Sequence, residues 1–170
     1  CNTTGSCNVA IGQSALLNNT TGCHNAAMGY RALCRNTTGV DNTAIGQYAL
    51  SNNTTGYENV AMGHMALYGS LSGIYNVAMG FHALYGNWGG NYNTAIGYTA
   101  LEKNTTGCFN VAMGCRVLCS NTTGNNNTGL GNSALLRNTT GTDNVAVGAN
   151  ALSINTTGYN NQAIGSFALS

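Results

Sequence analysis

Two linked segments decide the fold of this chain: Asn36-Thr37-Thr38-Gly39 and Asn42-Thr43-Ala44-Ile45-Gly46-Gln47-Tyr48-Ala49-Leu50. The same pattern returns every seventeen residues, so ten copies account for all 170 residues. Each residue therefore has a position from 1 to 17 within its copy, counted from Cys1. A unit this short cannot bury a core alone and must be stabilised by stacking on its neighbours. The sequence therefore predicts one elongated repeat array over residues 1–170, as a segment of a longer fibre.

Within the repeat, glycine and asparagine mark the corners. Positions 2–5 read Asn-Thr-Thr-Gly in eight of the ten copies and predict a turn. Positions 8–11 read Asn-x-Ala followed by an aliphatic residue or Met, which is typical of a short strand, and position 12 is always Gly. Positions 13–17 read x-x-Ala-Leu-x in nine copies and suggest a second extended segment. A helix is excluded because glycine interrupts every copy. We predict an all-β fold, a parallel β-solenoid or β-roll of ten 17-residue coils with two short strands per coil.

The small and apolar columns predict the core. Positions 10 and 15 are Ala in nine copies each, which implies close contact between the two sides of the coil. The leucines at position 16, together with Ile11, Met28, Ile45 and their equivalents at position 11, are expected to supply its bulk. Position 8 is Asn in every copy and predicts a ladder of hydrogen-bonded side chains between coils. A ligand track along that ladder is the functional alternative.

Charge and motif content exclude several classes of function. Only about 5% of the residues are charged, and the five basic ones form no run, so no nucleic-acid partner is expected. No apolar run reaches membrane length, so no membrane contact is expected. His24, His64 and His82 share no column and no Cys-x-x-Cys occurs, so neither a metal site nor a cofactor is expected. No catalytic constellation emerges, and we expect a protein that is not an enzyme.

The Asn-Thr-Thr turn matches the acceptor motif for N-glycosylation. Eight matches fall in the same column, where a turn could present a glycan outward and hydrate a surface with little charge. The alternative is a bare turn, with asparagine starting it and the threonines packing as a ladder. The predicted acceptors, and with them covalent N-glycans as partners, are Asn2, Asn19, Asn36, Asn53, Asn104, Asn121, Asn138 and Asn155.

Copies five and six lack the acceptor motif and collect aromatic residues instead. Aromatic rings suit contact with a sugar face or with another protein. One interpretation is a bare contact patch in the middle of a sugar-coated rod, and the other is that the rings stack along outer columns and cover the missing glycans. The predicted patch consists of Tyr68, Tyr75, Tyr85, Trp88 and Tyr92.

Seven cysteines are more than a reducing compartment favours in the absence of a metal site. Cys23 and Cys34 occupy positions 6 and 17, and the same pair of positions holds Cys108 and Cys119 five coils later. We therefore predict the disulfides Cys23–Cys34 and Cys108–Cys119, and a third between Cys1 and Cys7. Cys115 is left over, as a free thiol or an intermolecular partner.

Three segments carry a resemblance to a known family: Asn8-Val9-Ala10-Ile11-Gly12, Asn42-Thr43-Ala44-Ile45-Gly46 and Asn144-Val145-Ala146-Val147-Gly148. They resemble the head repeat of trimeric autotransporter adhesins, and the longer pattern looks like repeats of fibre and tail-fibre proteins. The resemblance covers all ten copies. It implies trimers of parallel β-rolls in an extracellular, fibrous protein. This chain departs from the family in its longer repeat, its Asn-Thr-Thr turns and its cysteines.

The leading functional hypothesis is a structural, extracellular fibre module at a cell or virion surface, N-glycosylated and assembling with itself. Uncapped terminal coils expose strand edges, which predicts end-to-end continuation in addition to trimeric assembly. An adhesin or a viral receptor-binding shaft is the alternative. Ice binding by a regular threonine face is a third hypothesis, and adjacent threonines argue against it because only one of two neighbours faces outward. A polysaccharide lyase is supported by analogy of fold alone.

Overall fold

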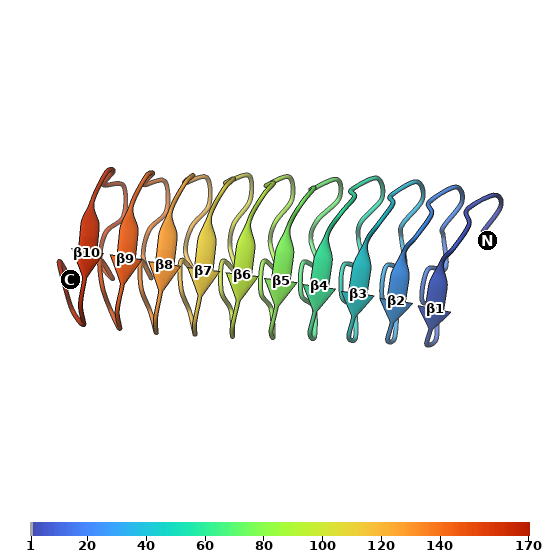
Figure 1. The fold of residues 1–170 in the computed structure, drawn as a ribbon, viewed down its shortest axis with the longest axis horizontal. Coiled ribbons are helices and arrows are strands. Elements are labelled where there is room, and N and C mark those ends of the chain that lie inside the picture. Colours follow the sequence, from blue (N-terminus) through green and yellow to red (C-terminus); the bar gives the residue numbers. More distant parts are fainter. Residues whose placement is uncertain (1) are drawn as a thin grey trace.

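The computed structural model of the chain describes residues 2–170 and contains ten parallel strands in a single sheet (Figure 1). Each strand pairs with the next one along the chain, so the order in the sheet is the order in the sequence. The strands are β1 (Val9–Ile11), β2 (Ala26–Met28), β3 (Thr43–Ile45), β4 (Val60–Met62), β5 (Val77–Met79), β6 (Thr94–Ile96), β7 (Val111–Met113), β8 (Thr128–Leu130), β9 (Val145–Val147) and β10 (Gln162–Ile164).

The predicted β-solenoid is confirmed. Equivalent residues face one another in every strand pair, so that Ala44 of β3 lies opposite Ala27 of β2 and Ala61 of β4. The coils follow one another along a straight rod, with residue 2 near one end and residue 170 near the other (Figure 1). At the usual spacing of parallel strands, ten coils extend about 48 Å.

The second predicted strand of each coil is wrong. Positions 13–17 form consecutive turns, because the residues at positions 14 and 16 have positive φ. Tyr48 has φ 58° and Leu50 has φ 49°, and the same left-handed conformation recurs at positions 7, 14 and 16 of every coil. This conformation costs about 1–2 kcal/mol in a residue other than glycine. Bonds between coils hold it in place: the Tyr48 amide donates to the Tyr30 carbonyl at 2.9 Å, and the Leu50 amide donates to the Ala66 carbonyl at 2.9 Å.

The core contains fewer of the repeat positions than predicted. Alanine at position 10 and leucine at position 16 are fully buried in the inner coils, as Ala61 and Leu67 illustrate. The side chains at position 11 were expected to be buried, and they point outward instead, with Met28 40% exposed. A three-residue strand can turn either its middle residue or its two outer residues inward. The coil interior has room for a methyl group beside the leucine, so the alanine points inward and the larger side chains point out.

Two asparagine ladders run through the interior. The predicted ladder at position 8 is present. The Asn42 Nδ2 donates to the Asn25 Oδ1 of the previous coil at 3.1 Å and to the Gly56 carbonyl of the following coil at 2.8 Å. Position 2 forms a second, unpredicted ladder. There the Asn36 Nδ2 donates to the Asn19 Oδ1 at 2.8 Å and to the Gly39 carbonyl at 2.9 Å. Both columns are buried in the inner coils, so these bonds satisfy polar groups that water cannot reach.

The glycines at position 5 are required by close approach of the coils rather than by φ. A Cβ built on Gly39 would overlap the carbonyl oxygen of Gly56 in the next coil and the Asn36 side chain of its own turn. At position 12 both causes act, because Gly46 has φ 129° and its Cβ would overlap Gly63. A side chain in either column would therefore force neighbouring coils apart.

Candidate functional site

The outer surface of the sheet is a regular surface that runs along the whole rod. We call it the strand face, defined by the first and third residues of β1 to β10. Its first column consists of Val9, Ala26, Thr43, Val60, Val77, Thr94, Val111, Thr128, Val145 and Gln162. Its second column consists of Ile11, Met28, Ile45, Met62, Met79, Ile96, Met113, Leu130, Val147 and Ile164.

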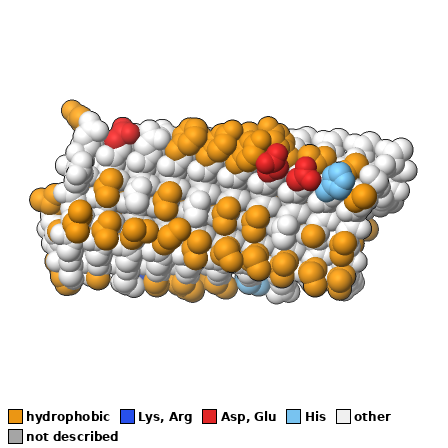
Figure 2. Space-filling model, in the orientation of Figure 1, with side chains coloured by type: hydrophobic (Ala, Val, Ile, Leu, Met, Phe, Trp, Pro, Cys, Tyr) orange, Lys and Arg blue, Asp and Glu red, His pale blue; other side chains and the backbone are white. Residues whose placement is uncertain are grey.

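The strand face carries no charge. All nine charged side chains of the chain lie at positions 1, 7, 14 and 17, and none lies at position 9 or 11. Figure 2 looks onto the strands and shows hydrophobic side chains in rows among white polar ones, with the visible acidic side chains towards one edge. Most residues of the face are half-buried by their own neighbours, while Ile11 and Met113 remain 55% and 40% exposed.

The size of the strand face can be estimated from strand geometry. Ten strands at about 4.8 Å and three residues at about 3.3 Å give a face of about 48 by 10 Å, or about 480 Å². Apolar patches of about 300–600 Å² are the largest found on typical monomers and often have a function. The flat sheet offers no cleft for a small molecule, so the arrangement suits contact with another flat surface.

The predicted aromatic patch is divided between two ladders. In one, Tyr75 stacks on Tyr92 with ring centroids 4.9 Å apart and planes at 11°, and Phe109 continues the stack at 4.9 Å and 5°. In the other, Tyr68 stacks on Tyr85 at 5.3 Å and 8°. No ring contact between the two ladders is recorded in residues 2–170, so the five predicted residues do not form one surface.

The stacked rings turn their edges outward, because their faces are covered by the neighbouring rings above and below. This arrangement fits the alternative interpretation, in which rings stack along outer columns. Figure 2 shows a continuous hydrophobic stretch along one edge of the rod, next to acidic side chains. The members exposed in the ladder at position 7 include Tyr75 and Phe109.

Tyr68, Tyr85 and Trp88 meet around a hollow of about 340 Å³. The hollow exists because Gly69 and Gly86 occupy position 1, where most other coils carry a longer side chain. Trp88 is 66% exposed and replaces the first threonine of the turn. These three residues of the predicted contact patch therefore surround one local hollow, while Tyr75 and Tyr92 lie in the other ladder.

The predicted row of glycans does not fit the folded coil. A glycan would be attached through the asparagine Nδ2, and in the inner coils this atom is buried and donates two hydrogen bonds. The glycosylation predicted at these six acceptors is therefore corrected to a structural ladder: Asn19, Asn36, Asn53, Asn104, Asn121 and Asn138. Asn2 is exposed in the first coil and Asn155 is half-buried in the last, so the steric argument does not extend to them.

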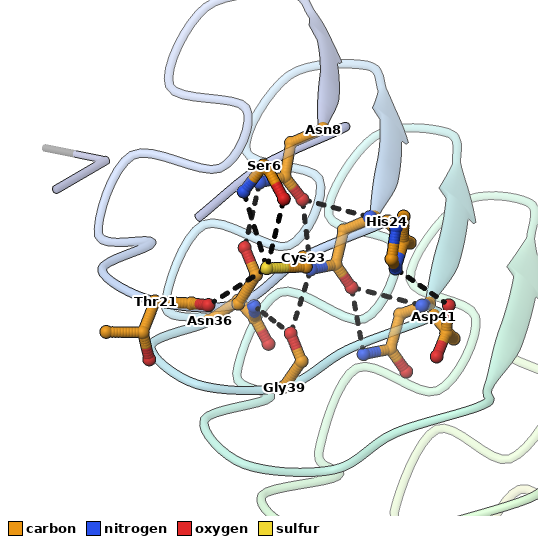
Figure 3. Close-up of polar contacts among 11 residues, drawn as sticks. Ser6, Asn8, Thr21, Cys23, His24, Asn36, Gly39 and Asp41 are labelled. Carbon is orange, nitrogen blue, oxygen red and sulfur yellow. Dashed lines mark hydrogen bonds and ion pairs between the residues drawn. The ribbon is translucent and has the colours of Figure 1, made fainter. Parts of the chain in front are cut away.

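The predicted disulfides Cys23–Cys34 and Cys108–Cys119 are absent, since all four are free thiols. The sulfurs of Cys23, Cys108 and Cys119 each contact the residue at the same position of the preceding coil instead. The Cys23 Sγ accepts from the Ser6 amide at 3.3 Å and lies 3.3 Å from the Thr21 carbonyl (Figure 3). Cys7 and Cys115 are also free, while Cys1, the other member of the third predicted pair, lies outside the described residues.

These surroundings give two thiols opposite properties. Hydrogen bonds from the Ser6 amide and hydroxyl lower the pKa of the half-buried Cys23 thiol. Burial, followed by the nearby Glu102 carboxylate, raises the pKa of Cys119. The Cys119 Sγ lies 3.5 Å from the Glu102 Oε2, one coil earlier at the same position.

Polar contacts near these thiols do not assemble a metal site. His24 Nδ1 lies 3.6 Å from Asp41 Oδ1 in the adjacent coil (Figure 3). In residues 2–170 no three His, Cys, Asp or Glu side chains gather into a group that could hold a metal ion. Within the same residues, no helix has the length and apolar character needed to cross a membrane.

No family model matches the chain, and neither a curated protein nor a solved structure matches it.

Proposed function

We propose that this chain is a structural module, a rigid rod whose strand face packs against other copies of the same chain to build a fibre. The observation that carries the proposal is the strand face itself, a flat, uncharged surface with two columns of mainly apolar side chains along the whole rod. Such a surface is favourable to bury and contains no charge that would have to be desolvated.

A second copy is the partner that fits this face best. The partner must be flat, uncharged and about 48 Å long, and its ridges must repeat at the strand spacing of about 4.8 Å. Another strand face meets all of these conditions. Two faces of about 480 Å² bury about 960 Å² in total, just below the about 1,000 Å² expected of a stable biological interface and in the range of weak contacts. Ten coils should therefore associate weakly, and longer arrays should associate more strongly in proportion to their length.

The rod's stiffness supports a structural role. Each coil is bonded to the next through its strand and its turns, and both asparagine ladders add bonds between coils except where Ser70 interrupts the second ladder, as the Asn42 and Asn36 bonds illustrate. The resemblance to adhesin heads adds a trimer and an extracellular location to the proposal. Neither free thiols nor buried acceptors add support for that location, so it rests on the resemblance.

Charge introduced on the strand face tests the proposal by sedimentation velocity over a range of concentrations. The variant carries Val60→Glu and Met62→Glu, both on β4. The matched control carries Leu71→Glu and Ile154→Glu, two exposed apolar residues outside the face. We expect the wild type and the control to associate with increasing concentration and the β4 variant to remain monomeric. A wild type that stays monomeric, or a control that dissociates equally, would contradict the proposal. Circular dichroism checks that each variant is folded.

An adhesive or receptor-binding shaft is a second candidate, favoured by the exposed Trp88 beside the Tyr68 and Tyr85 hollow. Changing Trp88 and Tyr85 to Ala should reduce adhesion to a target surface while leaving self-association unchanged. Unchanged adhesion would remove this candidate. Ice binding gains no support, because the Thr20 and Thr37 hydroxyls donate to carbonyls of the following coil at 2.9 and 3.0 Å.

A further inference from the structure

Three of the five basic residues of the chain gather around one groove. The groove has a volume of about 620 Å³ and follows positions 1, 14 and 17 from the fifth to the ninth coil, away from positions 9 and 11 of the strand face. We call it the basic groove. Its lining residues are Phe81, His82, Tyr98, Thr99, Glu102, Lys103, Arg116, Cys119, Ser120, Leu136 and Arg137.

The charges of the basic groove are unbalanced. Lys103, Arg116 and Arg137 face a single carboxylate, Glu102, which leaves a net charge of +2 with histidine neutral. The Glu102 carboxylate is already engaged by the His82 Nδ1 at 3.4 Å. In residues 2–170, none of the three cations has an ion pair within 4.0 Å. Three exposed cations without partners at the rim of a concave surface form an attractive site for an anion.

The cations are spaced along the rod. Lys103 and Arg137 both occupy position 1 and are separated by two coils, or about 10 Å at the strand spacing. Arg116 lies at position 14 of the same coil as Lys103. Between Lys103 and Arg137, position 1 holds the small Ser120, whose hydroxyl can hydrogen-bond a ligand lying in the groove. The geometry suits a chain with one negative charge for every two coils.

An aromatic ring marks one end of the basic groove. Tyr98 stacks on Phe81 with one face, at a centroid distance of 5.4 Å and an angle of 9°. The same position in the next coil is Cys115, so no further ring continues the stack towards Lys103. Tyr98 is 55% exposed. A flat ring with a polar hydroxyl edge suits the apolar face of a sugar.

We propose that the basic groove binds an anionic polysaccharide, with Lys103, Arg116 and Arg137 contacting carboxylate or sulfate groups and Tyr98 stacking on a sugar ring. A disaccharide repeat with one charge approximates the two-coil spacing of about 10 Å. Nucleic acid fits less well, because each strand carries a phosphate about every 3.4 Å. An acidic peptide provides carboxylates but no sugar ring for Tyr98. The site does not involve the strand face, so its test is independent of self-association.

Isothermal titration calorimetry at low salt tests the proposal with defined probes. The anionic sugars are a hyaluronan octasaccharide, which carries one carboxylate per disaccharide, and a chondroitin sulfate octasaccharide, which carries one sulfate per disaccharide in addition. Maltooctaose is the neutral control, while oligo(dT) and hexaglutamate represent the other two classes of anion. We expect at least one anionic sugar to bind more tightly than all three of these, and its identity distinguishes sulfate from carboxylate recognition.

Two variants assign the binding to the groove. Lys103→Ser, Arg116→Ser and Arg137→Ser together should weaken sugar binding at least about tenfold, the loss expected for one charged hydrogen bond. The matched control, Arg31→Ser with Arg35→Ser, removes the other two cations and should have little effect. Tyr98→Ala should weaken the sugar and leave hexaglutamate binding unchanged. The proposal is overturned by the absence of anionic sugar binding, by tighter binding of oligo(dT) or hexaglutamate, or by equal effects of the triple variant and its control.

Discussion

A single substitution in the fifth coil should stabilise the rod. Ser70 replaces asparagine at position 2 and interrupts the second asparagine ladder. The Asn53 Oδ1 and the Ser70 Oγ are buried and have no hydrogen-bond partner among the described residues. The next member, Asn87, keeps its bond to the Gly90 carbonyl at 2.8 Å but has no ladder acceptor in the preceding coil. Ser70→Asn would supply both the missing donor and the missing acceptor.

The expected gain follows from these orphaned groups. A buried polar group without a partner costs about 1–3 kcal/mol, and fixing the longer side chain costs about 1 kcal/mol. With two groups satisfied at the lower half of that range, the net gain is about 2 kcal/mol. For a chain of this size, about 2–4 °C per kcal/mol converts this gain to a Tm increase of about 4–8 °C.

Thermal unfolding followed by circular dichroism measures the gain, and hydrogen exchange locates it. The Thr54 amide, which donates to the Leu71 carbonyl at 2.8 Å, should exchange more slowly in Ser70→Asn. Ser72→Thr is the matched control, because it also restores the commonest residue of its column but lies on the surface. It should change stability by no more than about 0.5 kcal/mol. If the two variants raise the Tm equally, or if neither does, the orphaned groups do not determine the stability of this coil.

Three further predictions concern individual contacts in the rod. Val117 and Gly129 are the only exceptions in the two alanine columns, and a Cβ on Gly129 would overlap the Val117 side chain. Gly129→Ala should therefore destabilise the wild-type protein but stabilise the Val117→Ala variant, and a double-mutant cycle in thermal unfolding measures both effects. Asn93→Ala should cost several kcal/mol in chemical denaturation, because it removes bonds to two neighbouring coils at 2.8 and 3.2 Å. Cys23, with its lowered pKa, should be alkylated at lower pH than Cys119, whose pKa is raised, as mass spectrometry of iodoacetamide-treated protein can follow; equal rates would contradict the assigned surroundings.

The repeat period was sufficient to predict the fold, because seventeen residues cannot bury a core without stacking. It was not sufficient to orient the strand. The bulk of Ile45 and its equivalents suggested burial, yet hydrophobicity alone does not decide which side of a strand faces inward. The signal was in the middle column, where alanine in nine copies indicates a space too narrow for anything larger. The exposure of Met28 and its equivalents follows from that constraint.

The acceptor motifs and the cysteines were misread for a related reason. Asn36 matches a glycosylation motif, and a local motif does not reveal that the same side chain is bonded to the preceding coil. Cysteine occupies positions 6 and 17 in two different coils, which suggested that Cys23 and Cys34 pair within their coil. A position in the repeat, however, fixes only which residues lie above and below it in the neighbouring coils. Cys23 accordingly contacts Ser6, its equivalent in the previous coil.

The basic groove was missed because its residues are dispersed along the sequence. Lys103, Arg116 and Arg137 form no run, but Lys103 and Arg137 differ by 34, which is twice the repeat. Counting charges by column rather than by sequence would have placed these two in one column, two coils apart. The groove between the cations is also lined by Thr99 and Cys119, and only the folded coil brings these side chains together with the cations.

In the proposed fibre, the strand face is the interface between copies of this chain. A cryo-EM map of the assembled protein, at a resolution that resolves side chains, would show this interface. Neighbouring rods should meet through Val60, Met62, Val77, Met79 and their equivalents, with the basic groove left open to solvent. Assemblies whose strand faces are exposed, with contacts through the aromatic ladders or the groove instead, would contradict it.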